Sequence, residues 1–60
     1  MKITYYTNGS ITTKSLTEWF FGKKAVEDFT ASALNQHKAT KQTTFKFWQD
    51  GTGYLTVQIG

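Results

Sequence analysis

The chain lacks cysteine and arginine, and it contains no long apolar run. Without cysteine, neither a disulfide nor a thiolate-bound zinc ion can stabilise the fold, so stability must come from packed aromatic and aliphatic side chains. Its seven basic residues are all lysines, which give a net charge of +3 but disfavour bidentate recognition of phosphate or guanine. No run approaches the ~18 apolar residues of a membrane span, and no signal-peptide core follows Met1. We therefore expect a soluble, cytoplasmic protein that makes no membrane contact.

Residue types that support catalysis are also scarce. The only histidine, His37, falls at a predicted helix end, where a cation complements the helix dipole. Glu27 and Asp28 are the only neighbouring acids, and adjacent helix positions point in different directions. No His/Cys cluster has metal-ligand spacing, and no glycine-rich loop precedes a helix as phosphate binding requires. We expect no enzyme activity, no cofactor, no metal and no small-molecule substrate.

The 60 residues allow a single small domain, residues 1–60, with one core. A domain of this size buries only about 60% of its unfolded surface, and its stability is about 3–5 kcal/mol. Two turn signals, Asn8-Gly9 and Asp50-Gly51, are each flanked by residues suited to strands, and a helix-compatible stretch separates them. The pattern predicts an α+β fold in the order hairpin, helix, hairpin (ββαββ).

The first hairpin has two possible registers. A strict two-residue loop at Asn8-Gly9 would pair Tyr6 with Ile11, and it would place Ile11 on the opposite face from Ile3 and Tyr5. A longer loop would bring those three side chains together. We favour the longer loop, because it gives one apolar face.

Residues 15–21 fit either a helix or a strand. Ser15 and Glu18 match a helix capping box, whereas Thr17 and the aromatic run 19–21 favour a strand. A helix continuing from there to His37 would direct Phe20 and Phe21 away from its apolar stripe, and it would contain Gly22. We therefore end the second strand near Phe21.

The segment from Lys23 to His37 is predicted as a helix whose apolar face contains Val26, Phe29, Ala33 and partly Thr30. Residues 38–42 are polar and form the connection to the last hairpin. There, alternation favours a short loop at 50–52 and a register that pairs Phe47 with Leu55, Phe45 with Val57, Trp48 with Tyr54, and Lys46 with Thr56. The expected core is Phe29, Phe45, Phe47, Leu55 and Val57.

Three segments are similar to the immunoglobulin-binding domains of streptococcal protein G and of protein L, which have the β-grasp fold. They are the turn Asn8-Gly9-Ser10, the helix segment 25–35 with Phe29, and the closing stretch 50–57. The resemblance implies a four-stranded mixed sheet whose first and last strands are adjacent and parallel at the centre, with one helix packed on one face. The basic charge and the run Trp19-Phe20-Phe21 depart from that family, so we transfer the architecture and no binding residues.

The predicted sheet face away from the helix collects exposed aromatic and basic side chains. They are Trp48, Tyr54, Lys46, Tyr6 and Lys2. Such a set either stabilises the sheet through a cross-strand Trp–Tyr pair or binds a partner. A second candidate patch combines Trp19 with Lys23 and Lys24, because three consecutive aromatic side chains cannot all face one core.

The sequence thus indicates a non-enzymatic module that binds another macromolecule. A protein partner is favoured, and the small size suits an inhibitor or adaptor of the kind encoded by a phage or mobile element. The alternative is a small nucleic-acid-binding protein, in which bases stack on the aromatic side chains and lysines neutralise phosphates.

Overall fold

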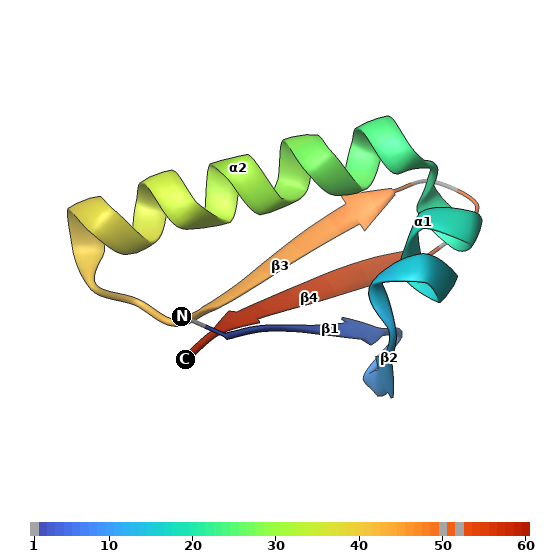
Figure 1. The fold of residues 1–60 in the computed structure, drawn as a ribbon, viewed down its shortest axis with the longest axis horizontal. Helices are drawn as coiled ribbons and strands as arrows, with labels where there is room; N and C mark the ends of the chain where they lie inside the picture. The colour runs from blue at the N-terminus through green and yellow to red at the C-terminus, as the bar shows by residue number, and fades with distance from the viewer. Residues whose placement is uncertain (1, 50, 52) are drawn as a thin grey trace.

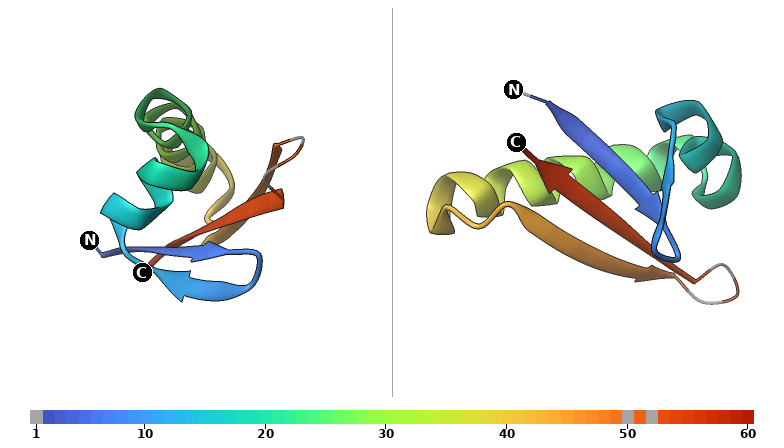
Figure 2. Two further views of the ribbon diagram at one scale, coloured as in Figure 1. Left: turned by 90° about the vertical axis from the view of Figure 1, so that its right-hand side faces the viewer. Right: turned by 90° about the horizontal axis from the view of Figure 1, so that it is seen from below.

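A computed structural model describes residues 2–49, 51 and 53–60 as one four-stranded sheet with two helices on the same side of it (Figure 1, Figure 2). The sheet has the order β2-β1-β4-β3. In chain order the elements are β1 (Ile3–Thr7), β2 (Ser10–Thr12), α1 (Lys14–Phe21), α2 (Lys23–Thr40), β3 (Thr44–Gln49) and β4 (Gly53–Ile59). The predicted α+β class and the central position of the first and last strands are confirmed.

All neighbouring strands are antiparallel, so the expected mixed sheet is wrong. In the central pair, Ile3 lies opposite Ile59 and Thr7 opposite Leu55. The antiparallel direction of the central pair follows from the segment between the two hairpins. β2 has only three residues, so it does not cross the sheet, and α1 then brings the chain into the helix layer at the end of the sheet where β1 finishes. From there α2 runs back along the sheet, and β3 begins at the far end, near both termini (Figure 1).

The first hairpin uses the strict two-residue loop, contrary to our expectation. Asn8 and Gly9 have φ angles of 50° and 88°. Positive φ at both positions is typical of the type I′ turn, whose twist matches that of the strands it joins. Tyr6 therefore lies opposite Ile11, and the Ile11 side chain is 70% exposed on the face away from the helices. The turn chemistry outweighs the burial of one isoleucine on so short a strand.

Residues 14–21 form helix α1, so the predicted strand ending near Phe21 is wrong. The helix begins after Thr13, whose side-chain oxygen accepts a hydrogen bond from the Leu16 amide at 3.2 Å. It buries Thr17 and Phe21, which are four residues apart and therefore share one helix face. The Thr17 hydroxyl lies 2.9 Å from the Thr12 hydroxyl and donates to the Thr13 carbonyl, which ties α1 to the end of β2.

Helix α2 begins at Lys23 as predicted and continues to Thr40, three residues beyond the expected end at His37. Each of the helix ends has an identifiable cause. Gly22, with φ 93°, ends α1 and precedes α2, and Lys41 adopts a left-handed conformation after the last turn. His37 makes a structural contact near the end of α2, because its Nδ1 lies 2.7 Å from the Gln42 carbonyl oxygen and holds the connection to β3.

The core lies between the sheet and the two helices. Its buried apolar members are Tyr5, Phe21, Val26, Ala33, Phe45, Leu55, Val57 and Ile59. The prediction is confirmed for Phe45, Leu55 and Val57, whereas Phe29 and Phe47 are only partly buried. These two rings stack on each other with centroids 4.8 Å apart, at the side of the core next to β3, one of the two edge strands.

The last hairpin has the predicted register in full. Phe45 pairs with Val57, Phe47 with Leu55, Lys46 with Thr56, and Trp48 with Tyr54. Gln49 pairs with Gly53 and encloses the predicted loop, of which Asp50 and Thr52 lie outside the described residues.

A pair of glycine substitutions tests how this hairpin meets the first one. Gly51 and Gly53 both have positive φ, so alanine at either position should cost about 1 kcal/mol. A methyl group at Gly53 would also collide with the Asn8 side chain, whose oxygen accepts the Tyr54 amide hydrogen bond at 3.0 Å, whereas one at Gly51 meets no atom within 4 Å. Displacing that bond should bring the loss for Gly53→Ala to about 2 kcal/mol. Urea unfolding measures both, and equal losses would contradict the close approach.

Candidate binding surface

The sheet face turned away from the helices is here called the open face. On β4, Leu55, Val57 and Ile59 point into the core and alternate with Tyr54, Thr56 and Gln58, which lie on the open face, where Thr56 is buried and Gln58 is exposed. The register with β3 adds Trp48 beside Tyr54 and Lys46 beside Thr56. The predicted register, which puts Trp48, Tyr54 and Lys46 on one face of the sheet, is confirmed, and the role of this face in binding stays a prediction.

Trp48 and Tyr54 form the aromatic centre of the open face. Their ring centroids are 4.8 Å apart, with the planes tilted by 44°. The Lys46 ammonium nitrogen lies 5.6 Å from the Tyr54 centroid, within the range of a cation–π interaction. Trp48 nevertheless remains 72% exposed. The pair therefore presents a large apolar surface in a fixed position with a positive charge beside it.

Tyr54 is also held from its other side, by the turn of the first hairpin. A Cβ atom at Gly9 would lie 3.2 Å from the Tyr54 hydroxyl oxygen, so the ring extends from β4 to that turn. The Asn8 amide donates to the Tyr54 carbonyl at 3.0 Å, and the Asn8 side chain accepts from the Tyr54 amide. The aromatic centre is thus ordered before any partner arrives, which lowers the entropy cost of binding.

The first hairpin extends the open face beyond the predicted residues. Tyr6 lies opposite Thr56 on one side and opposite Ile11 on the other. Ile11 is the residue that sequence reasoning missed, because we assigned it to the core. The signal that identifies it is the Asn-Gly dipeptide, which by itself favours the two-residue turn.

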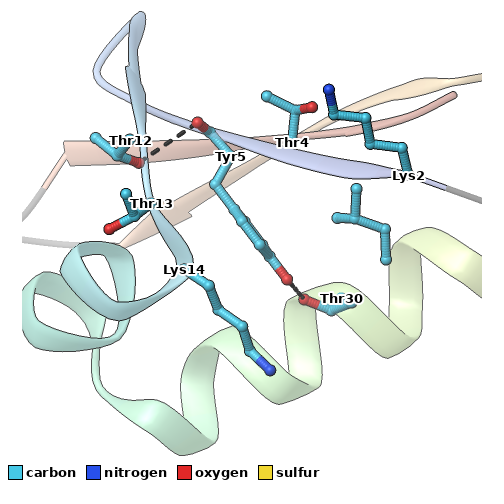
Figure 3. A pocket seen from close by; sticks show the side chains of 8 residues that line it. Lys2, Thr4, Tyr5, Thr12, Thr13, Lys14 and Thr30 are labelled. Carbon is cyan, nitrogen blue, oxygen red and sulfur yellow. Dashed lines mark hydrogen bonds between the residues drawn. The ribbon is translucent and has the colours of Figure 1, made fainter.

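Lys2 lies at the opposite end of the open face from Trp48. Its backbone pairs with that of Gly60 through two hydrogen bonds of 2.9 and 2.8 Å, which extend the ladder between β1 and β4. Lys2 and Thr4 project from β1 away from α2 (Figure 3). Tyr6 lies four positions after Lys2, a distance of about 13 Å along the strand, so Lys2 can only contact the rim of a partner centred on Trp48.

The open face is basic. Among the described residues the acids are Glu18 on α1 and Glu27 and Asp28 on α2, so none lies on a strand. The lysines of the open face are Lys46 and Lys2. A partner whose contact surface is acidic at its edge would therefore meet complementary charge.

The second predicted patch lies on α1 and at the start of α2. Trp19 is 78% exposed, and its ring packs edge-on against Phe20 with centroids 5.2 Å apart. Lys23 and Lys24 are exposed in the first turn of α2. Leu16 and Phe20, each 46% exposed, make this α1 surface more apolar than the sequence suggested. They were missed because the segment was interpreted as a strand.

A pocket of about 440 Å³ opens where β1 extends past the short strand β2. It lies between β1 and α2, and the Tyr5 ring crosses it, with the hydroxyl 3.0 Å from that of Thr30 (Figure 3). The Lys2 and Lys14 ammonium groups point to opposite sides of the pocket (Figure 3). Because the lysines diverge and the hydroxyls already bond each other, the pocket has no set of groups that converge on a ligand.

Comparisons with protein-family models, with curated proteins and with solved structures found no significant match. Within residues 2–49, 51 and 53–60, no three His, Cys, Asp or Glu side chains lie close enough to share a metal ion. No helix in that part of the chain combines the length and apolar character needed to cross a membrane. The exposed surfaces described above are therefore the features of the molecule that bear on its function.

Proposed function

We propose that this domain is a non-enzymatic protein-binding module and that the open face is its binding surface. The observation that carries the proposal is the 72% exposure of Trp48 in a position fixed by its contact with Tyr54. Tryptophan and tyrosine dominate the energetics of protein interfaces, because they bury much apolar area with few rotatable bonds. Burying Trp48 in a pocket of the partner would release its exposed area from water.

The charge of the open face defines the partner further. Lys46 lies beside the aromatic centre and Lys2 lies at the rim, so the partner should have an apolar pocket bordered by acidic side chains. A rigid domain of this size can block or bridge sites on a larger protein. This is the role of an inhibitor or adaptor, and a phage or mobile element is a source consistent with it.

Nucleic-acid binding is the alternative, and the grouping of Lys46 with the Trp48–Tyr54 pair favours it. Bases could stack on Trp48 while the lysines neutralise phosphates. The two lysines of the open face would give a modest electrostatic contribution, with a slope of log K against log salt of about −1.4 on a single strand. We favour the protein partner because apolar surface exceeds charge on the open face.

The test compares the two exposed tryptophans. The double variant Trp48→Ala with Tyr54→Ala and the single variant Trp19→Ala each serve as bait in lysate of the source cell, with and without nuclease. Trp19 is the matched control, because it is equally exposed but lies on α1. The binding partner is then purified and titrated by calorimetry. We expect the double variant to bind at least about 30-fold more weakly, as the loss of a hot spot implies, and Trp19→Ala to bind as the parent does.

Two results would redirect the proposal. If Trp19→Ala abolishes binding and the double variant binds normally, the α1 surface is the site. If capture requires intact nucleic acid, the nucleic-acid-binding alternative applies. The Trp19→Ala variant then offers a direct assay, because Trp48 is its only tryptophan. Quenching of its fluorescence by a thymidine oligonucleotide, weakening with salt at the slope given above, would establish base stacking on Trp48.

A further inference from the structure

Among the described residues, no strand pairs with the outer edge of β3. β3 is the last strand of the sheet, and no described element lies beyond it (Figure 2). The Thr43 carbonyl accepts a hydrogen bond from the Ile59 amide at 2.8 Å, which shows which residue pairs of β3 and β4 are hydrogen-bonded to each other. Hydrogen-bonded pairs alternate along antiparallel strands, so Phe45 and Phe47 direct their backbone groups toward β4. The amides and carbonyls of Thr44, Lys46 and Trp48 therefore point outward, as a free template for another strand.

The sequence of β3 is complementary to itself in one register. Two copies related by a two-fold axis pair antiparallel, and both keep their helices on the same side. With Phe47 opposite Phe47 of the second copy, Lys46 lies opposite Trp48 of the second copy, which allows a cation–π contact. A register that placed Lys46 opposite Lys46 of the second copy would bring two like charges together. In the favoured register, the outward backbone groups of Lys46 and Trp48 also fall at hydrogen-bonding positions.

The core next to this edge is incomplete in the single chain. Phe47 points toward the helix layer and stacks on Phe29, yet both rings stay partly exposed. In the favoured register the two copies of Phe47 form a non-hydrogen-bonded pair, the position where side chains approach most closely. A second copy would cover the side of the Phe29–Phe47 stack that the single chain leaves open.

We propose that two copies of this chain associate through β3 into one eight-stranded sheet, with Phe47 at the two-fold axis. The open faces then become continuous, and each Trp48 lies near the axis beside Lys46 of the other copy. A single strand pair buries less area than a standard interface, so the association is weak and reversible. Its failure would leave the partner-binding proposal intact, because that proposal uses the open face of one copy.

Amide hydrogen exchange tests the pairing at residue level. At low concentration the amides of Lys46 and Trp48 should exchange rapidly, whereas those of Phe45 and Phe47 should be protected by β4. As concentration rises from about 10 µM to about 1 mM, the range of weak transient association, the first pair should become protected and the sedimentation coefficient should increase. A monomer at the highest concentration, or rapid exchange at Lys46 and Trp48 throughout, would overturn the proposal.

Two variants at one position add a matched control. Lys46→Pro removes an outward amide, a change that an edge strand tolerates, and should weaken dimer formation at least about 100-fold. Lys46→Ala keeps the amide and should weaken it no more than about tenfold, through loss of the contact with Trp48. Equal dimer formation by the proline variant and the parent chain would show that another surface, such as the α1 surface, makes the dimer. If the proline variant fails to fold, the exchange pattern of the parent chain still decides.

Discussion

Replacing Leu55 with alanine should leave the domain largely unfolded at room temperature. Leu55 is completely buried on the central strand β4, opposite Phe47 on one side and Thr7 on the other. Truncating a buried leucine costs about 2–5 kcal/mol, because the lost transfer energy adds to the cost of a cavity. A domain of this size has only about 3–5 kcal/mol to lose. Circular dichroism with urea titration measures the change in the free energy of unfolding.

The control lies three residues further along the same strand. Gln58 is exposed on the open face, so Gln58→Ala should change stability by no more than about 0.5 kcal/mol. Phe47→Ala should cost less than about 3 kcal/mol despite the larger side chain, because Phe47 is only partly buried. If Phe47→Ala lowers the free energy of unfolding more than Leu55→Ala does, the core is more closely packed beside β3 than the structure indicates.

The last hairpin was predictable because two signals agreed. Alternation of Phe45 and Phe47 with polar neighbours matched that of Leu55 and Val57, and a three-residue loop aligned both sets. Shifting the pairing by one residue would have exposed every apolar side chain. The same alternation placed Trp48 beside Tyr54, so the centre of the candidate site followed from the core without any functional motif.

The first hairpin and α1 were mispredicted because their signals conflict. Ile11 is the only large apolar residue on β2. Burying this one side chain favours the longer loop only weakly, whereas the Asn-Gly dipeptide strongly favours the two-residue turn. In residues 14–21, the strand preference of the aromatic side chains competes with a Thr13 cap and with the spacing of Thr17 and Phe21. Burial of the Thr17 and Phe21 side chains in the core decides in favour of the helix. The secondary-structure propensity of a residue does not tell whether its side chain will be buried.

That error also explains the reversed direction of the last hairpin. A second strand reaching Phe21 would cross the sheet, and the following helix would return the chain for a parallel central pair. With α1 in its place, the chain enters α2 from the opposite end, and β4 runs antiparallel to β1. The relative direction of β1 and β4 at the centre of the sheet thus depends on α1, a helix of eight residues outside the sheet.

Substituting Gly22 tests this dependence directly. Gly22 has φ 93° and ψ 140°, a region in which residues other than glycine are strained by about 1–3 kcal/mol. Its amide donates to the Glu18 carbonyl at 2.8 Å, and its carbonyl accepts the Val26 amide at 3.1 Å, so one residue ends α1 and begins α2. An added Cβ would meet no atom within 4 Å, so any effect of Gly22→Ala comes from the backbone alone.

Gly22→Ala should therefore lower the melting temperature by about 8–16 °C, as a loss of about 2 kcal/mol implies for a domain of this size. The chain can relieve the strain by continuing the helix through position 22, which would remove Phe21 and Thr17 from their buried positions. Backbone chemical shifts should then show helical values at 22 and loss of the ordered contacts of α1. Lys23→Ala, at an exposed neighbouring position, should melt as the parent does. An unchanged melting temperature for Gly22→Ala would mean that the break between the helices does not depend on glycine, and that packing of α1 alone sets the direction of the sheet.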